Sequence, residues 1–343
     1  MTKSLVTGGA GFMGSHVAEH LLRMGHEVVV LDDLSGGFRE NVPHDAHFVH
    51  GSITQACLVN DLFERCAFDF VYHLAAYAAE GLSHFIKRFN YTNNLIGSVN
   101  LINASVNHNV KCFVFTSSIA VYGAGQTPMT EDMTPIPEDS YGIAKLAVEQ
   151  ELRVSHEMFG LDHVIFRPHN VYGERQNVGD RYRNVVGIFM NQLLRGEPMT
   201  IFGDGAQQRA FTHIDDVAPT LARAVDVPAA RNQTFNIGAD VPHTVNELAQ
   251  VVGEAMGVPP SIRYLDARNE VAIAFSDHSK AERMFGRRDA KTLSEGVAAM
   301  AAWVRGHGAK ESNIFEDIEI LKRLPPSWAC ATRAPNRSEI VGN

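Results

Sequence analysis

Short runs of apolar residues, many of them β-branched or aromatic, alternate with stretches of helical periodicity along the first half of the chain. These runs occupy residues 5–6, 28–31, 48–49, 70–74, 113–115 and 164–166. Strands that are buried on both faces form continuous apolar runs, and strands joined through helices pair in parallel. The pattern therefore predicts an α/β fold in which helices cover both faces of a doubly wound parallel sheet.

The pattern loosens after residue 167, which we take as a domain boundary. Connections rich in Gly, Asn and Arg follow, with a helical segment near residues 185–194 and a strand-like segment at 199–202. Apolar periodicity fades again from residue 311, as it does in weakly ordered termini. The expected division is a sheet domain at 1–167, a smaller α/β lobe at 168–310 that crosses back to the sheet near 211–240, and a weakly ordered C-terminal tail at 311–343.

Charge and cysteine usage limit the partners and the compartment. The chain of 343 residues has a formal net charge of -9 and no run of Lys or Arg, so we expect neither nucleic-acid nor anionic-membrane binding. No apolar stretch has the length of a membrane span, and the segment before Gly8 is too short for a signal peptide. The four cysteines form no C-x-x-C pair, which is typical of a reducing compartment, so we expect a cytoplasmic protein.

Two histidine patterns resemble metal sites. His16, Glu19 and His20 have the spacing that places two imidazoles on one helical face, as in zinc peptidases. The glycines before this helix favour a different role for it, in binding phosphate. Three more histidines at 44–50 lie in a loop that enters a short strand, where consecutive members face different ways. We therefore expect no metal ion.

A glycine-rich loop lies between the first predicted strand and the first predicted helix. Gly8 or Gly9 permits a tight turn before the helix. Gly11 lets a pyrophosphate approach bare backbone, and Gly14 lets the helix pack against the strand. Asp32 follows eighteen residues after Gly14, at a strand end where a carboxylate accepts hydrogen bonds from ribose hydroxyls and repels a 2'-phosphate. Loop and acid together predict NAD, rather than NADP, as the cofactor.

A tyrosine and a lysine have the spacing of an acid–base pair. Tyr141 and Lys145 are four residues apart, so a helix places the phenol and the ammonium on the same face. The pKa of an unperturbed tyrosine is about 10, so a phenol that acts as a base near neutrality needs adjacent positive charge. Lys145 and an oxidised nicotinamide both supply it. The strand end at 115–118 directs a hydroxyl towards the same point.

With these motifs in this order, the sequence resembles the extended short-chain dehydrogenase/reductase family, in its NAD-dependent nucleotide-sugar epimerase and dehydratase branch. The resemblance runs from Leu5 to about Phe285 and implies an enzyme with a Rossmann-type sheet and a C-terminal lobe that binds a nucleotide sugar. The motifs that carry it are residues 7–14, 73–76, 93–94, 117–123, Tyr141 with Lys145, 167–170, 201–205 and 209–216.

The resemblance also implies roles for single residues. By position, Tyr141 is the acid/base, Lys145 binds the nicotinamide ribose, and Ser118 binds the sugar oxygen beside Tyr141. The implied cofactor contacts are Gly8, Gly11, Phe12, Met13, Gly14, Asp32, Ser52, Ile53, Leu74, Ala75, Ala76, Asn93, Tyr141, Lys145 and Pro168. The implied substrate contacts are Ser118, Tyr141, Asn170, Thr200, Phe202, Arg209, Arg268 and Ala274, with the two arginines as a diphosphate clamp. One position departs from the family, because Ser52 stands where an Asp often holds the adenine.

The resemblance further implies the reaction. In this branch the tyrosine removes the proton of the sugar C4 hydroxyl while a hydride moves to NAD. The 4,6-dehydratases carry an Asp-Glu pair at the positions of Ile119 and Ala120, and the UDP-glucuronate decarboxylases carry a Glu at the latter. Neither side chain here transfers a proton, so we expect 4-epimerisation of a UDP-hexose through a transient 4-keto sugar. Dehydration, decarboxylation and a non-catalytic NAD-binding regulator are the alternatives.

The identity of the hexose stays open among glucose/galactose, their N-acetyl forms and the uronates. In the 4-epimerases, the residue at the position of Ala274 lies next to the sugar C2 substituent, and a small side chain there leaves room for an acetamide. The resemblance also implies a homodimer, formed through two helices that pair across a two-fold axis in relatives. The matching apolar residues are Leu95, Val99, Ile102, Val106, Leu146 and Leu152.

Overall fold

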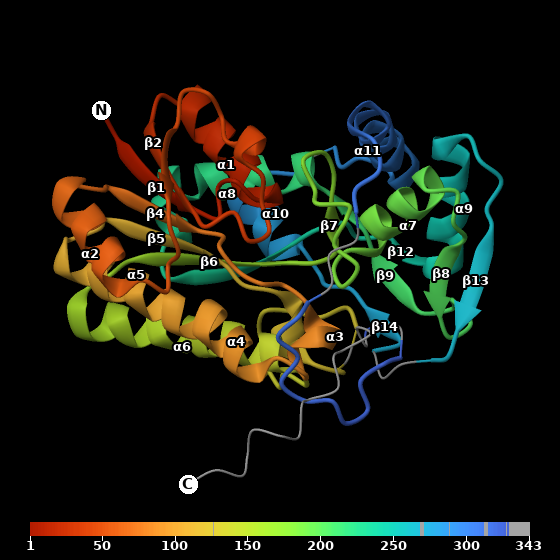
Figure 1. Cartoon of the computed structure of the whole chain (residues 1–343). Helices are drawn as coiled ribbons and strands as arrows, with labels where there is room; N and C mark the ends of the chain where they lie inside the picture. The colour runs from red at the N-terminus through yellow and green to blue at the C-terminus, as the bar shows by residue number, and fades with distance from the viewer. Residues whose placement is uncertain (126, 268–270, 288, 312–314, 327, 329–343) are drawn as a thin grey trace, which may run out of the picture.

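A parallel β-sheet forms the centre of the protein, whose computed structural model describes residues 1–125, 127–267, 271–287, 289–311, 315–326 and 328 (Figure 1). Within these residues the sheet has seven strands, and every pairing in it is parallel. The expected doubly wound sheet is thereby confirmed, with one strand for each apolar run of the first half of the chain. The spatial order is β11 (Gln233–Ile237), β6 (His163–Pro168), β5 (Cys112–Thr116), β4 (Phe70–His73), β1 (Lys3–Thr7), β2 (Glu27–Asp32) and β3 (His47–His50).

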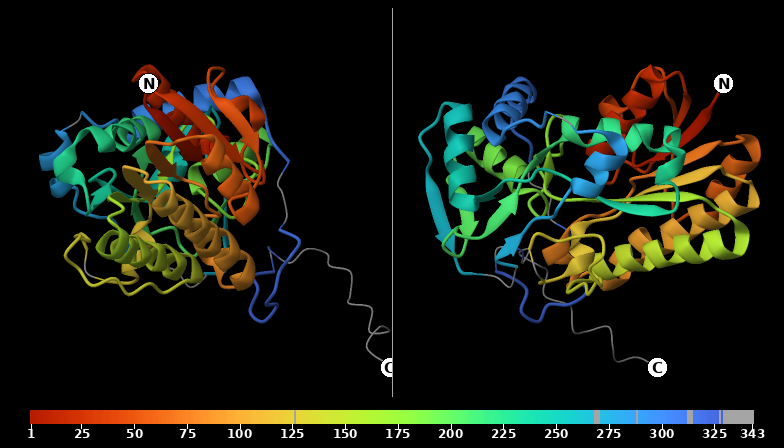
Figure 2. Two further views of the ribbon diagram at one scale, coloured as in Figure 1. Left: turned by 90° about the vertical axis from the view of Figure 1, so that its left-hand side faces the viewer. Right: turned by 180° about the vertical axis from the view of Figure 1, so that it is seen from behind.

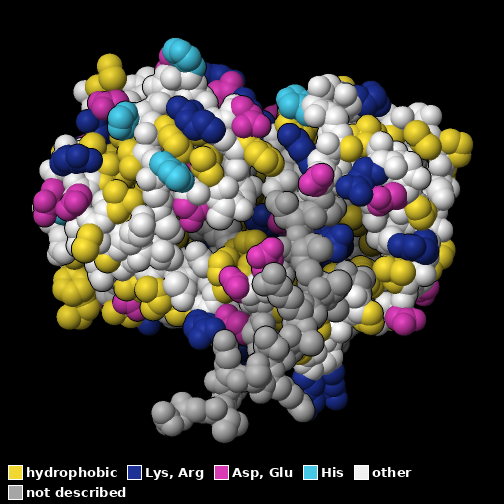
Figure 3. Space-filling view, viewed as in Figure 1, with side chains coloured by type: hydrophobic (Ala, Val, Ile, Leu, Met, Phe, Trp, Pro, Cys, Tyr) yellow, Lys and Arg dark blue, Asp and Glu magenta, His cyan; other side chains and the backbone are white. Residues whose placement is uncertain are grey.

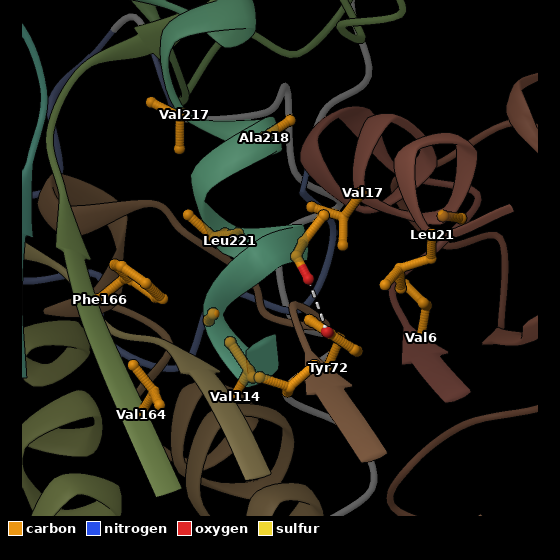
Figure 4. Packing of buried hydrophobic residues seen from close by; sticks show 14 of the residues in the cluster. Val6, Val17, Leu21, Tyr72, Val114, Val164, Phe166, Val217, Ala218 and Leu221 are labelled. Carbon is orange, nitrogen blue, oxygen red and sulfur yellow. Dashed lines mark hydrogen bonds between the residues drawn. The ribbon is translucent and has the colours of Figure 1, made fainter. Parts of the chain in front are cut away.

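Helices cover both faces of the sheet, because alternate residues of each strand point to opposite faces (Figure 2). On β1, Val6 packs against one group of helices and Leu5 against the other. Figure 4 shows the first core, in which the buried Tyr72 hydroxyl donates a hydrogen bond of 2.8 Å to the Ala222 carbonyl oxygen. The first group is α1 (Phe12–Arg23), α8 (Ala218–Arg223) and α10 (Ser279–Phe285), and the second is α2 (Ala56–Arg65), α5 (Gly97–Asn107) and α6 (Ser140–Phe159).

A smaller lobe encloses a third apolar core beside the carboxyl ends of the strands (Figure 1). The chain enters this lobe after β6 and returns to the sheet at β11, so the lobe is not one continuous stretch of sequence. The domain boundaries near residues 167 and 310 stay predictions. The lobe contains α7 (Val185–Leu194), β8 (Met199–Phe202), β9 (Gln208–Ala210), β12 (Pro242–Thr244), α9 (Val245–Met256), β13 (Ile262–Leu265), β14 (Ile273–Ala274) and α11 (Leu293–His307).

No helix in the described part of the chain is long and apolar enough to span a membrane.

Short elements connect these parts and lie around the strand ends. The connecting elements are α3 (Glu80–Ser83), α4 (Lys87–Tyr91), the π-helix η2 (Thr92–Ile96), the paired strands β7 (Val171–Tyr172) and β10 (Thr212–His213), and the 3₁₀ turns η1 (Arg39–Asn41), η3 (Ile119–Tyr122), η4 (Ile214–Asp216), η5 (Ala224–Asp226) and η6 (Pro228–Ala230).

Residues 315–326 and Trp328, which we name the C-terminal segment, pack against α3 and α4. The Glu319 carboxylate accepts hydrogen bonds from the backbone nitrogens of Arg88 and Phe89, at 2.8 and 2.9 Å. The sequence analysis did not foresee these contacts, and the weakly ordered tail from residue 311 stays a prediction. The contacts leave no signal in the sequence because they come from separate apolar side chains that follow no helical or strand period. Those side chains are Phe315, Ile318, Leu324 and Trp328.

Candidate active site

A cavity of about 820 Å³ lies between the carboxyl ends of the sheet strands and the smaller lobe. Figure 3 shows a hollow at this boundary. Arg268 lies outside the described residues. All the other residues that the sequence analysis assigned to cofactor, substrate or catalysis line this one cavity: Gly8, Gly11, Phe12, Met13, Gly14, Asp32, Ser52, Ile53, Leu74, Ala75, Ala76, Asn93, Ser118, Tyr141, Lys145, Pro168, Asn170, Thr200, Phe202, Arg209 and Ala274.

The glycine-rich loop joins β1 to α1 in a conformation that larger residues do not fit. Gly8 has a φ of +72°, and a Cβ atom on it would lie 2.7 Å from the backbone nitrogen of Ala75. A Cβ atom on Gly14 would collide with the carbonyl oxygen of Gly8. Gly11 immediately precedes the first turn of α1, so the free N–H groups of this helix end at the loop. The loop therefore has the open backbone that a pyrophosphate cradle needs, and the contact itself stays a prediction.

The helix that begins at this loop also carries the first histidine pattern. Glu19 pairs with Arg175 at 2.6 Å, and His16 contacts the backbone oxygen of Glu174 at 3.1 Å. Among the residues the structure describes, no three His, Cys, Asp or Glu side chains are grouped to hold a metal ion.

Asp32 lies at the end of β2, beside the loop. Its carboxylate accepts hydrogen bonds from the backbone nitrogens of Ala10 and Leu34, at 3.0 and 2.8 Å, which fix it at the cavity wall. Burial raises the pKa of Asp32 above its usual value, although these two bonds oppose the shift. Ser52 also lines the cavity, and its hydroxyl accepts a hydrogen bond of 3.0 Å from Thr54. The position that departs from the family thus carries a hydroxyl with a local partner.

Ser118, Tyr141 and Lys145 meet at the other side of the cavity. Ser118 precedes η3, and its hydroxyl lies close enough to the Tyr141 phenol to lower the pKa of the phenol. Lys145 is one helical turn after Tyr141 on α6, and its Nζ lies 5.8 Å from the centre of the tyrosine ring. The same Nζ donates a hydrogen bond of 2.7 Å to the Thr116 carbonyl oxygen at the end of β5. The predicted phenol, ammonium and hydroxyl are therefore brought together.

Burial dominates the electrostatics of this group. It lowers the pKa of Lys145 to about 7, against the effect of Glu149. Burial and the Glu80 carboxylate raise the pKa of Tyr141, while Ser118 and Arg183 act in the opposite direction. Burial outweighs the groups that favour the tyrosinate, and the activation of Tyr141 by Lys145 stays a prediction.

The residues expected to hold the nucleotide sugar lie on the smaller lobe and at its junction with the sheet. Thr200 and Phe202 are on β8, and Asn170 lies between β6 and β7. The Arg209 guanidinium on β9 donates a hydrogen bond of 2.6 Å to the Val271 carbonyl oxygen and so ties β9 to the approach of β14. Ala274, on β14, lies opposite Arg209 in the parallel pairing of the two strands. This wall is thus assembled from four separate parts of the chain.

Comparison with known proteins identifies the family. The NAD-dependent epimerase/dehydratase family matches residues 4–238. The chain belongs to this family. A UDP-glucose 4-epimerase of Mycolicibacterium smegmatis is 35% identical over 312 residues, which cover 88% of this chain and 98% of that protein. The structure of the Thermotoga maritima UDP-glucose 4-epimerase with UDP-glucose has a TM-score of 0.85 and 34% identity, covering 89% of this chain and 99% of that one. The structure of a UDP-N-acetylglucosamine 4-epimerase from Methanobrevibacter ruminantium has a TM-score of 0.83 and 29% identity, covering 89% of this chain and 99% of that one.

As a member of the NAD-dependent epimerase/dehydratase family, the protein is an enzyme with NAD as its cofactor. The cavity fits this cofactor. The glycine cradle matches a pyrophosphate, and two buried polar atoms on the wall, Thr116 Oγ1 and Gln176 Oε1, have no hydrogen-bond partner among the described residues. Buried polar atoms are rarely left unpaired, so a polar ligand accounts for both.

The sequence analysis did not identify three polar residues: Asp139 and Arg183, which line the cavity, and Ser83, which contacts Tyr141. Asp139 directly precedes α6 and accepts a hydrogen bond of 2.8 Å from the Gly142 nitrogen, while Ser83 accepts one of 3.2 Å from the Tyr141 nitrogen. Arg183 lies 4.8 Å above the Tyr77 ring. An Asp directly before a helical run is a visible capping signal, so Asp139 was accessible to sequence reasoning. No local pattern marks Ser83 or Arg183.

A buried ion pair joins α6 to β6. The Arg167 guanidinium donates to both carboxylate oxygens of Glu149, at 2.9 and 2.5 Å. Ser117 donates to the same carboxylate, and a third guanidinium nitrogen donates to the Tyr122 hydroxyl at 2.7 Å. The network joins α6 to β6 and to Ser117, the residue before Ser118, and therefore fixes the segments that carry Ser118 and Tyr141.

Proposed function

We propose that the protein interconverts UDP-hexoses of opposite configuration at C4 and recycles NAD in each turnover. The observation that carries this proposal is the meeting of Ser118, Tyr141 and Lys145 in one cavity, between a dinucleotide cradle and the smaller lobe. The 4-epimerase activities of the M. smegmatis and T. maritima relatives support the choice of UDP-glucose and UDP-galactose as the first substrates to test.

In this proposal the side chains move one proton and hold one sugar oxygen. Tyr141 accepts the proton of the C4 hydroxyl and later returns it, and Ser118 hydrogen-bonds the same oxygen. Lys145, held against the Thr116 carbonyl, orients the nicotinamide ribose. When bound, NAD supplies the hydride acceptor and donor, and its positive ring supplies the charge that lowers the pKa of the buried phenol.

The residues after Ser118 favour epimerisation over elimination. Ile119 and Ala120 both line the cavity, and neither side chain transfers a proton. Loss of water or carbon dioxide from the sugar needs a further acid or base, so a simple return of the hydride to the other face is the reaction these residues support. Glu80 lines the same cavity and lies near enough to Tyr141 to raise its pKa. Because its carboxylate is a further acid or base at the site, the test of function must also detect dehydration products.

A panel of nucleotide sugars, incubated with the purified protein and analysed by chromatography, tests this function. We expect UDP-glucose and UDP-galactose to interconvert with no added NAD. A 4-keto-6-deoxy product would instead identify a dehydratase, and a pentose product a decarboxylase. A protein that binds NAD but converts nothing on the panel would be a regulator, and a strict requirement for added NADP would contradict the role of Asp32.

The size of the residue at position 274 is expected to set the acceptance of N-acetyl sugars. Ala274 is buried in the cavity wall, and steric exclusion is the main means by which a pocket rejects an added group. We expect the wild type to accept UDP-N-acetylglucosamine, as the M. ruminantium relative is named for doing. Ala274→Tyr should lower kcat/KM for this substrate at least about tenfold relative to UDP-glucose. An unchanged ratio of the two kcat/KM values would show that Ala274 is not the gate.

We further propose a homodimer, with α6 in the interface. Ile143, Val154 and Met158 are 44%, 38% and 68% exposed, and spacings of eleven and four residues place them on one face of α6. Ile96 of the adjacent η2 is 51% exposed. Two of the residues expected at this interface, Ile102 and Leu152, cannot contact a second chain because they are buried in the core on one face of the sheet. The exposed face of α6 replaces them in the proposal.

Light scattering at micromolar concentration tests the dimer. We expect twice the mass of one chain for the wild type and a shift towards the monomer for Val154→Glu, because a charge in an apolar interface loses its hydration. Val241→Glu is the matched control, since Val241 is 62% exposed and lies on the smaller lobe. A monomeric wild type, or equal behaviour of both variants, would contradict the proposed interface.

A further inference from the structure

The C-terminal segment follows α11, the last helix of the smaller lobe, and lies outside residues 4–238, which the family match covers. The M. smegmatis and T. maritima alignments cover 98% and 99% of those proteins but only 88% and 89% of this one. The segment crosses the front of α3 (Figure 1, dark blue).

Contacts at two points hold the segment against the cavity wall. The Phe315 ring packs against Tyr77 and Phe89, with ring centres 5.6 and 4.8 Å apart, and its backbone nitrogen donates a hydrogen bond of 3.2 Å to the Tyr182 hydroxyl. The Glu319 carboxylate accepts hydrogen bonds from the backbone nitrogens of Arg88 and Phe89 in the first turn of α4, as described above. Tyr77, Phe89 and Tyr182 themselves line the cavity. The segment therefore rests directly on residues of the active site.

Trp328 extends from this segment into the cavity wall. Its side chain is only 5% exposed, lines the cavity, and makes edge contacts with Phe85 and Tyr182 at 6.2 and 5.5 Å between ring centres. The indole lies against Gly81, where an added Cβ atom would be 3.1 Å from Trp328 Cη2 and would meet no other side chain in the described structure within 4 Å. The missing side chain at Gly81 is what makes room for the indole.

The position of Gly81 places Trp328 at the reacting end of the cavity. Gly81 and Ser83 belong to the single turn of α3, and Ser83 accepts the hydrogen bond of the Tyr141 backbone nitrogen. The residues expected near the nucleobase, Thr200 and Phe202, are instead on β8 in the smaller lobe. An indole at the Tyr141 end offers an apolar face to the C–H groups of a sugar ring, and aromatic side chains bind amphipathic groups well in such settings.

We propose that Trp328 is a specificity-determining residue that contacts the sugar, but not the nucleotide, of the substrate. The inference rests on the proposed function, which supplies the nucleotide sugar. It gives the C-terminal segment a role in substrate selection. It also predicts that sugar and nucleotide binding respond differently to changes at this position.

The test compares binding of UDP-glucose and of UDP to the NAD-loaded enzyme by titration calorimetry. We expect Trp328→Ala to raise the Kd and KM of UDP-glucose about tenfold and to leave the Kd of UDP within about twofold. Leu321→Ala is the matched control, because Leu321 belongs to the same segment and is 65% exposed. Gly81→Leu tests the same contact from the opposite partner. The leucine side chain would occupy the space of the indole, so this variant should also weaken UDP-glucose binding and leave UDP binding unchanged. The double variant Gly81→Leu/Trp328→Ala should be no weaker than either single variant.

Each result decides the matter. Equal weakening of UDP and UDP-glucose by both Trp328→Ala and Gly81→Leu would assign the segment a structural role and overturn the proposal. Unchanged binding of both ligands in the variants would overturn it as well. If the variants gave either of these results while the wild type still converted UDP-glucose, the Trp328 proposal would fall and the proposed function would stand. A wild type that neither binds nor converts any UDP-sugar would overturn both the Trp328 proposal and the proposed function.

Discussion

Replacement of Tyr141 by phenylalanine is expected to lower kcat about 10²- to 10⁴-fold, the range in which a positioned acid–base group contributes. The ring volume and the buried contacts of the side chain remain, so α6 and the cavity should keep their structure. NAD should also remain bound, because the cradle is formed by the loop at 8–14 and by Asp32. The measurement pairs the rate of UDP-galactose conversion with the NAD released from the denatured protein.

The matched control for this substitution is Tyr264→Phe. Tyr264 is 54% exposed on β13, and its hydroxyl bonds Asn246 at 3.1 Å, away from the cavity. Its loss should leave the rate within about twofold of the wild type, as for most surface substitutions. Retention of more than a tenth of the wild-type rate by Tyr141→Phe would remove Tyr141 from the acid–base role.

Glu149→Ala is expected to lower the free energy of unfolding by about 3–5 kcal/mol, because it leaves the Arg167 charge buried without its partner. Both side chains are nearly inaccessible, at 4% and 6% exposure, so water cannot replace the lost carboxylate. Urea unfolding of the NAD-loaded protein measures the change. Since Glu149 shares α6 with Tyr141 and binds Ser117 next to Ser118, we also expect a lower kcat under conditions where the variant is folded.

Two further variants separate the buried charge from other effects. Glu157→Ala removes an exposed partner of Arg153 on the same helix, and exposed pairs contribute about 0–1 kcal/mol. Replacing both members of the buried pair by methionine should recover much of the loss, because no unpaired charge remains. If Glu149→Ala unfolded no more readily than Glu157→Ala, the buried pair would not stabilise the fold.

The features that the sequence alone determined are those written in local spacing. Each apolar run of the first half forms a strand of the sheet, because a short run of β-branched and aromatic residues can be recognised without knowledge of its partner strand. The glycines at 8, 11 and 14 and the Tyr141–Lys145 pair lie within one turn or loop each, so their geometry follows from the element that contains them. Together they sufficed to predict the sheet, the cofactor and the sides of the cavity that carry the acid–base group.

The tertiary structure decided what depends on contacts between distant segments. It showed that the expected interface residues Ile102 and Leu152 are core residues, since an apolar stripe has the same period whether it faces a sheet or a second chain. It brought Arg183 over Tyr77, and Trp328 against Gly81 nearly 250 residues earlier in the chain. Such contacts leave no periodic signal in either segment, because each depends on one side chain and one complementary space. The wall at the reacting end of the cavity is therefore a property of the folded chain alone.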